Sequence, residues 1–111
     1  MDKLAEYREI IQQVLTIHAQ IKPAYGEIER QTIFDVQQDH YQVVNTGWEN
    51  RRRIYSCLIH LDIRDCKIWI QYDGTEIGVA NELIEYGIPK QDIVLAYQPP
   101  YMRKLTEFAV G

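Results

Sequence analysis

The stretch Ile54–Glu76 constrains the fold of this chain most, because apolar and polar residues alternate on both sides of a short polar break. A two-residue turn at Asp65 and Cys66 pairs the two halves as antiparallel strands. Side chains alternate between the two faces of a sheet, and cross-strand partners share a face. The stretch therefore predicts a hairpin with an apolar face for the core and a polar, aromatic face.

The predicted register defines both faces of this hairpin. The apolar face consists of three cross-strand pairs, namely Ile63 with Ile68, Leu61 with Ile70, and Ile59 with Tyr72. The other face carries two pairs, Asp62 with Trp69 and His60 with Gln71. In this register Cys57 falls on the apolar face and Cys66 in the turn, so we expect two free thiols rather than a disulfide.

An amphipathic helix is predicted before the strands, from Asp2 to Lys22. Apolar residues recur there at spacings of three and four, Asp2 is suited to cap the start, and Pro23 ends the pattern. Glu27–Trp48 follows as two strands separated by a polar break, and short connections lead on to Ile54–Glu76. Four consecutive strands with short connections predict an antiparallel meander.

A second helix is predicted after the turn at Asp73 and Gly74, with Thr75 as its N-cap and Gly87 just past its end. Its inward residues are expected to be Ile77, Ala80, Leu83 and Ile84. The apolar run Ile93–Ala96 predicts an edge strand or an extended segment. A short terminal helix over 101–110 is expected to point four residues inward: Met102, Leu105, Phe108 and Ala109.

Together these elements predict a single α+β domain over residues 1–111. Its expected order is an N-terminal helix, a four-stranded antiparallel meander, a second helix, a short extended segment and a C-terminal helix. No apolar run reaches the roughly 18 residues that span a bilayer, and the N-terminus lacks a signal-peptide pattern, so we expect a cytoplasmic protein without membrane association. The net charge of −4 argues against a protein that holds nucleic acid mainly by its own positive field.

The chain carries titratable groups but no recognised catalytic motif. The candidates for acid–base chemistry are His40, His60, Asp62, Asp73 and Glu76. His60 and Asp62 lie two residues apart on one strand face, an arrangement that can bind a metal or orient a base. The same arrangement is also expected for two structural residues that are hydrogen-bonded beside Trp69. We favour this structural interpretation. We therefore assign no catalytic residue, metal ligand or cofactor, and treat His60, Asp62 and Gln71 as a candidate polar site.

Aromatic residues exceed what the core of so small a domain needs, and such an excess is typical of protein interfaces. The candidate partner-binding residues are Trp48, Trp69, Tyr97, Tyr101 and Arg103. We expect an exposed aromatic patch around Trp69 or over 97–101.

Three ordered segments resemble the XisI family, the fdxN element excision controlling factors of filamentous cyanobacteria. They are DHYQVVNTGW at 39–48, IHLDIRDCKIWIQYDGTE at 59–76 and ELIEYGIPKQDIVLAYQPPYMRKLTEFA at 82–109. Cys66 departs from the family, whose turn often has glycine there, and this leaves the turn geometry open. The resemblance implies a role in programmed excision of a DNA element, together with a XisH-type partner and a separate site-specific recombinase.

The leading hypothesis is therefore a non-enzymatic accessory protein that binds a XisH-like protein and acts on DNA indirectly. Two alternatives stay open. A small metal- or His/Asp-dependent enzyme predicts a concave pocket in which His60 and Asp62 converge. A direct DNA-binding factor predicts one continuous basic surface, formed by Arg51–Arg53 with Arg103 and Lys104.

The sequence also allows a homodimer, because an exposed sheet face or edge invites self-association. Ile10 and Ile17 widen the apolar arc of the first helix. They are expected either to complete its contact with the sheet, which we favour, or to contact a second subunit.

Overall fold

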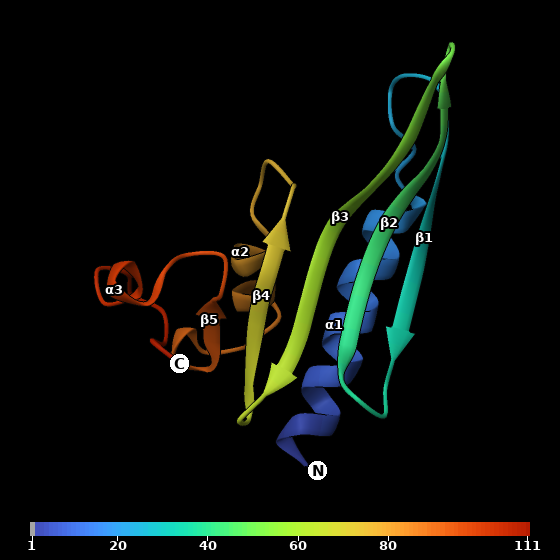
Figure 1. Ribbon diagram of the computed structural model, residues 1–111. Helices are drawn as coiled ribbons and strands as arrows, with labels where there is room; N and C mark the ends of the chain where they lie inside the picture. Colours follow the sequence, from blue (N-terminus) through green and yellow to red (C-terminus); the bar gives the residue numbers. More distant parts are fainter. Residues whose placement is uncertain (1) are drawn as a thin grey trace.

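The computed structural model, which describes residues 2–111, is a five-stranded sheet with α-helices packed around it (Figure 1). Its elements, in chain order, are α1 (Lys3–Gln20), β1 (Glu27–Asp35), β2 (His40–Glu49), β3 (Arg52–Arg64), β4 (Lys67–Asp73), α2 (Val79–Glu85), the 3₁₀ turn η1 (Lys90–Asp92), β5 (Ile93–Leu95) and α3 (Pro100–Arg103). The strands follow each other across the sheet in the order β1-β2-β3-β4-β5. The α+β class is confirmed.

The sheet has one strand more than the predicted four. Strands β1 to β4 form the expected antiparallel meander, whereas β5 pairs parallel to β4, with Ile68 opposite Ile93 and Ile70 opposite Leu95. A parallel strand is usually covered on both faces, and all three residues of β5 are buried. This burial explains why the strand is apolar throughout instead of alternating.

Helix α1 begins as the sequence predicts and ends at Gln20, two residues before the predicted Lys22. The Asp2 carboxylate accepts a hydrogen bond from the Leu4 N–H at 3.1 Å, and the chain leaves the helix after Gln20, ahead of Pro23. Ile10 is buried in the core, whereas Ile17 is about half exposed, so only the first of this pair belongs to the core. Among residues 2–111 no helix is both long enough and apolar enough to cross a membrane.

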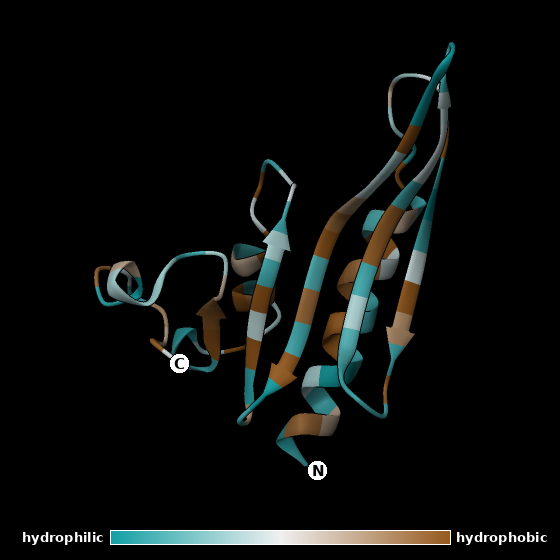
Figure 2. Cartoon of the chain, viewed as in Figure 1, coloured by the Kyte–Doolittle hydropathy of each residue, from teal (hydrophilic) through white to brown (hydrophobic). Residues whose placement is uncertain are grey.

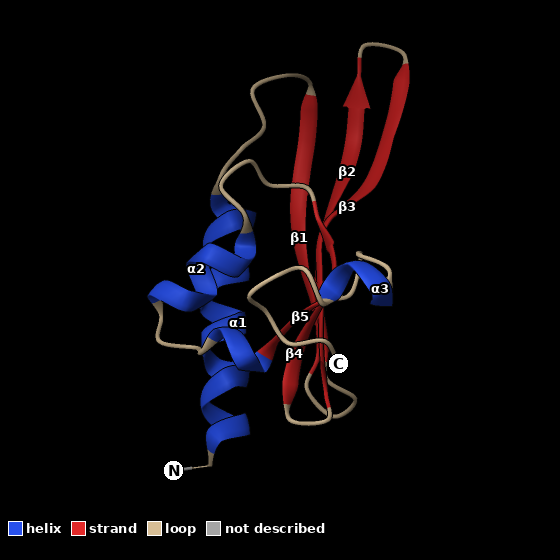
Figure 3. Cartoon of the chain, turned by 90° about the vertical axis from the view of Figure 1, so that its left-hand side faces the viewer, coloured by secondary structure: helices blue, strands red, loops and turns tan. Residues whose placement is uncertain are grey.

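The core lies between one face of the sheet and the two helices α1 and α2, which stand together on that side in Figure 3. Apolar and polar residues alternate along the central strands (Figure 2), so the apolar side chains gather on one face of the sheet and form the core there. The most deeply buried side chains of β2, β3 and β4 are Tyr41, Val43, Ile59, Leu61, Ile68 and Ile70. The opposite face, called the outer face below, carries the polar side chains and is partly covered by the segment that contains α3 (Figure 3).

The β3–β4 turn is the predicted two-residue turn. Asp65 and Cys66 both have positive φ, 52° and 61°, as a type I′ turn requires. The three pairs next to the turn are confirmed, namely Ile63 with Ile68, Asp62 with Trp69 and Leu61 with Ile70.

Beyond these pairs the predicted register is wrong. A bulge leaves Gln71 as an extra residue on β4, so His60 pairs with Tyr72 and Ile59 with Asp73. Tyr72 is accordingly exposed rather than part of the core.

A second bulge, at Leu58 on β3, changes the face of Cys57. Val43 pairs with Ile59 but Val44 pairs with Cys57, so the register shifts by one residue. Leu58 and Ile59 both pack on the core, whereas Cys57 shares the outer face with Val44. Cys57 is thus on the face opposite to the predicted one, although both cysteines are free as expected.

The predicted start of α2 is also wrong. The helix begins at Val79 rather than after Thr75, because Asp73 organises the loop: its carboxylate accepts hydrogen bonds from Thr75 N–H at 2.9 Å, Thr75 Oγ1 at 2.6 Å and Val79 N–H at 2.8 Å. Gly78 precedes the helix with φ of 92°, and Ile77 is exposed rather than inward.

The end of α2 matches the prediction. Gly87 has φ of 99°, the Gly87 N–H donates to Ile84 O at 2.9 Å, and the Ile88 N–H donates to Leu83 O at 3.1 Å. These two bonds form a Schellman motif, which satisfies the last carbonyls of the helix.

The predicted terminal helix over 101–110 is not formed. Helix α3 is a single turn that ends at Arg103, and Met102 and Leu105 are exposed. The chain instead returns to the sheet, where Ala109 bridges Val94 and donates its N–H to the Ile93 carbonyl at 2.9 Å. Pairing at the sheet edge therefore outweighs the helical pattern, although Ala109 is buried as expected.

Candidate functional site

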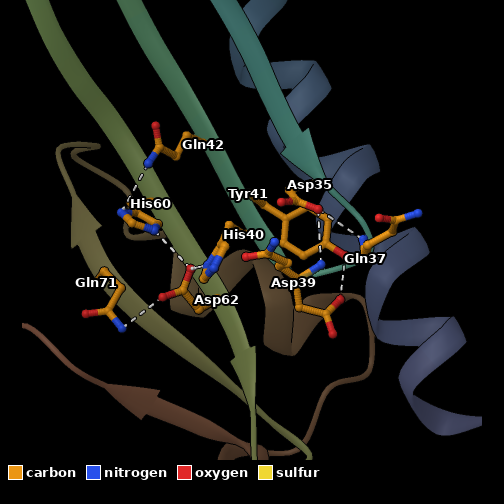
Figure 4. Close-up of polar contacts among 10 residues, drawn as sticks. Asp35, Gln37, Asp39, His40, Tyr41, Gln42, His60, Asp62 and Gln71 are labelled. Atoms are coloured by element: carbon orange, nitrogen blue, oxygen red, sulfur yellow. Dashed lines mark hydrogen bonds and ion pairs between the residues drawn. The ribbon is translucent and has the colours of Figure 1, made fainter.

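Four polar side chains from three neighbouring strands meet on the outer face of the sheet (Figure 4). We call them the polar cluster: His40 from β2, His60 and Asp62 from β3, and Gln71 from β4. His60 and Asp62 share a face because side chains alternate along a strand. His40 joins them because it pairs directly with Asp62 across β2 and β3.

The Asp62 carboxylate is the centre of the polar cluster. Its Oδ1 lies 2.8 Å from His40 Nδ1 and 2.9 Å from His60 Nε2, and its Oδ2 accepts a hydrogen bond from Gln71 Nε2 at 3.2 Å. Asp62 is only 6% exposed. A carboxylate buried without such partners destabilises the fold, so these contacts explain how Asp62 is tolerated there.

The two histidines differ in how freely they reach solvent. The side chain of His40 is 50% exposed and that of His60 28%. The hydrogen bond to Asp62, reinforced by the negative charge of the same carboxylate, raises the pKa of His40 above its ordinary value. The Gln42 amide lies 3.5 Å from the other ring nitrogen of His60, Nδ1. His40, His60 and Asp62 together offer three ligand atoms within 4.8 Å of one another.

Trp69 stands opposite Asp62 on the same face and is half-buried. Its indole N–H donates to the Arg64 carbonyl at 2.9 Å, and the guanidinium carbons of Arg64 and Arg103 lie 5.1 and 5.6 Å from the ring centre. Arg103 also donates to two backbone carbonyls, of Gln98 at 3.0 Å and Ala96 at 3.2 Å. Arg103 therefore links the segment before α3, through its backbone carbonyls, to the Trp69 ring on the sheet.

The chain matches the family model described as XisI protein over residues 1–110. The chain belongs to the XisI family. Two solved structures, both of proteins from Anabaena variabilis ATCC 29413, resemble it over nearly their whole length. A XisI-like protein is 42% identical with a TM-score of 0.91, covering 97% of this chain and 99% of its own. The fdxN element excision controlling factor XisI is 33% identical with a TM-score of 0.85, covering 99% and 100%. Among curated proteins no match was found.

In this XisI-family chain the predicted partner-binding residues lie in two separate regions. Tyr97 and Tyr101 are exposed on the segment that Arg103 holds beside Trp69. Trp48 is exposed on the arm formed by the far ends of β2 and β3, where the guanidinium carbon of Arg53 lies 5.5 Å from its ring centre. The structure thus brings four of the five residues to one side of the fold and separates Trp48 from them.

The basic residues expected to form one DNA-binding surface in this XisI-family chain lie far apart. Arg51–Arg53 are at the tip of the β2–β3 arm, and Arg103 and Lys104 belong to the α3 region at the other side of the molecule (Figure 1). Arg52 pairs with Glu49 at 3.1 Å. These residues therefore do not make the continuous basic surface that the DNA-binding alternative requires.

The concave pocket expected for an enzyme does not coincide with the polar cluster. His60 and Asp62 do converge, but on the outer face of the sheet. The surface hollow of about 770 Å³ is lined mainly by α1, with Val36 and Tyr86 beside it. A second hollow, of about 410 Å³, lies at the end of α1 next to β1. Neither of these two hollows is lined by a residue of the polar cluster.

Proposed function

We propose that this protein is an accessory factor in the programmed excision of a DNA element and that it acts by binding a XisH-like protein rather than by catalysis. One observation carries the proposal: the chain shares its fold over 99% of its length with a protein described as the fdxN element excision controlling factor XisI. The resemblance to that family implies the XisH-like partner.

The charge distribution supports an indirect action on DNA. The chain has a net charge of −4, and its basic residues are divided between the β2–β3 arm and the α3 region. Affinity for a phosphate backbone comes from several basic groups that act together, and it falls steeply with salt. A partner that supplies the DNA contacts fits this distribution better than direct binding.

We place the partner-binding surface on four exposed side chains around α3, which we call the C-terminal surface: Tyr97, Tyr101, Met102 and Leu105. Aromatic and methionine side chains are enriched in the cores of protein interfaces. The contacts of Arg103 with the backbone carbonyls of Ala96 and Gln98 hold this segment in one conformation, which lowers the entropy lost on binding. The surface is thus both apolar and preorganised.

Co-purification of the protein with its XisH-like partner tests this function. We expect a stable complex, and we expect Tyr101→Ala to weaken it, because Tyr101 is 68% exposed on the C-terminal surface. Tyr55→Ala is the matched control, since Tyr55 is 73% exposed on the β2–β3 arm, away from that surface. Failure of the wild-type chain to retain the partner, or equal weakening by both variants, contradicts the proposal.

The homodimer that the sequence allows stays a prediction. Strand β1 ends the sheet order, so its outer edge is available for pairing with another chain. It carries charged side chains at Glu27, Glu29 and Arg30, which oppose edge-to-edge association. Sedimentation analysis of the free chain distinguishes monomer from dimer.

A further inference from the structure

We infer that His40, His60 and Asp62 form a binding site for a divalent first-row transition cation, of which Zn²⁺ is the representative. The site would be held by His40 Nδ1, His60 Nε2 and the Asp62 carboxylate. It goes beyond the proposed partner-binding function and is independent of it, because none of its three ligands belongs to the C-terminal surface.

The donor set is the first support for this site. Two imidazole nitrogens and one carboxylate oxygen are ligands that Zn²⁺ and its neighbours in the first transition row accept. A hard cation such as Mg²⁺ prefers oxygen ligands and would not select this set. The three groups belong to two adjacent strands, β2 and β3, and cross-strand pairing of His40 with Asp62 and of Gln42 with His60 fixes the backbone positions that carry them.

The distances are the second support. Ligands about 2.0–2.2 Å from a tetrahedral Zn²⁺ lie roughly 3.3–3.5 Å from one another. Both histidine nitrogens already lie 2.8 and 2.9 Å from the same oxygen, Asp62 Oδ1. All three ligand atoms lie within 4.8 Å of one another. A cation therefore enters if both rings turn, so that each nitrogen moves about half an ångström away from Asp62 Oδ1 and the two nitrogens reach the same tetrahedral spacing from each other. The half-exposed His40 ring has room to do so.

The residues around the ligands are the third support. Outer partners that orient ligands are a regular part of metal sites. The Gln71 amide donates to Asp62 Oδ2, which fixes the carboxylate plane and turns Oδ1 toward both histidines. The Gln42 amide beside His60 Nδ1 leaves Nε2 as the ligand nitrogen. The exposure of His40 leaves the remaining coordination position to water.

A calorimetric titration of the untagged, EDTA-treated protein with ZnCl₂ tests the site. We expect saturation at one Zn²⁺ per chain. The variants His40→Gln and His60→Gln each remove a ligand, so binding should weaken by more than the 10- to 100-fold typical of losing an outer partner. Gln71→Leu removes only an outer partner and should weaken binding by about 10-fold or more. A purely structural role of Gln71 predicts no change in Zn²⁺ affinity.

The third histidine of the chain provides the control. His18 pairs with Glu82 at 2.7 Å between α1 and α2, away from the polar cluster, so His18→Gln should bind Zn²⁺ like the wild type. We expect His40→Gln to fold like the wild type, because the His40 side chain is half exposed at the start of its strand, so a loss of Zn²⁺ binding in this variant reports on the site. The inference is overturned if the wild type shows no saturable binding, or if His40→Gln and His60→Gln bind as the wild type does.

Discussion

Replacing Cys66 with glycine should stabilise the protein. Cys66 has φ of 61° in the β3–β4 turn. The left-handed conformation costs a residue with a side chain about 1–2 kcal/mol, and glycine adopts it freely. Glycine also gives the unfolded chain more conformational entropy, which stabilises the unfolded state and cancels about 0.4–1 kcal/mol of this benefit. Cys66 is exposed, so its replacement by glycine loses no stabilisation from burial of the side chain. We therefore expect Cys66→Gly to raise the free energy of unfolding by about 0.5–1 kcal/mol.

Urea denaturation followed by circular dichroism measures this change, and the melting temperature should rise by roughly 2–4 °C for a domain of this size. Cys66→Ser is the matched control, since it removes the thiol but keeps the side chain that disfavours positive φ. Its stability should match that of the wild type. A neutral or destabilising Cys66→Gly, or a Cys66→Ser variant stabilised to the same degree, would refute the argument from backbone conformation.

Three further predictions concern the loops and the packing of α1. Asp73→Ala removes the acceptor of three hydrogen bonds at the entry to α2 and should lower the free energy of unfolding by about 3 kcal/mol; a loss below 1 kcal/mol in urea denaturation contradicts this role. Burial opposes ionisation of Asp92, but hydrogen bonds from the Tyr7 hydroxyl and the Lys3 ammonium outweigh it and hold its pKa below the ordinary value. Ionised Asp92 therefore contributes its full stabilisation above the ordinary carboxyl pKa, and this contribution is lost as the pH falls through the lowered pKa. Tyr7→Phe removes one of the two hydrogen bonds, so its free energy of unfolding should fall less than that of the wild type between neutral pH and about pH 3. Identical pH profiles of melting temperature would exclude this link. Arg103→Ala should increase amide hydrogen exchange over 96–103, and unchanged exchange there would show that Arg103 does not hold the segment.

The sequence predicted the part of the fold that period-two alternation and turn chemistry determine. The hairpin turn at 65–66 and the three pairs beside it follow from residues whose effects are local, and so does the glycine after α2. Strand β5 was predicted only as an edge strand or an extended segment, because the four-residue apolar run Ile93–Ala96 is too short to show a period. The helical pattern over 101–110 was overridden by a distant partner, the edge of β5.

The composition of the polar cluster could not be predicted in full, because the bulge at Leu58 shifts the register between β2 and β3 by one residue. Counting back from the pair of Glu49 with Arg52 without a bulge places His40 opposite Leu61, a core position. The extra residue Leu58 moves the partner of His40 to Asp62 and so brings the second histidine to the cluster. A bulge inserts a single residue, which leaves no periodic signal in the sequence. His60 and Asp62 were found because they lie on one strand, where alternation alone decides the face.

The affinity of the purified chain for its XisH-like partner tests the central claim most directly. Titration calorimetry on the wild type, Tyr101→Ala and Tyr55→Ala gives three dissociation constants under identical conditions. The account predicts measurable binding by the wild type and by Tyr55→Ala, with Tyr101→Ala weaker by about 2 kcal/mol, roughly 30-fold, as for a residue central to an interface. Equal constants for all three proteins would place the interface elsewhere. The account would be contradicted if the wild type does not bind the partner but cleaves or binds DNA, and if His60→Gln loses that DNA activity.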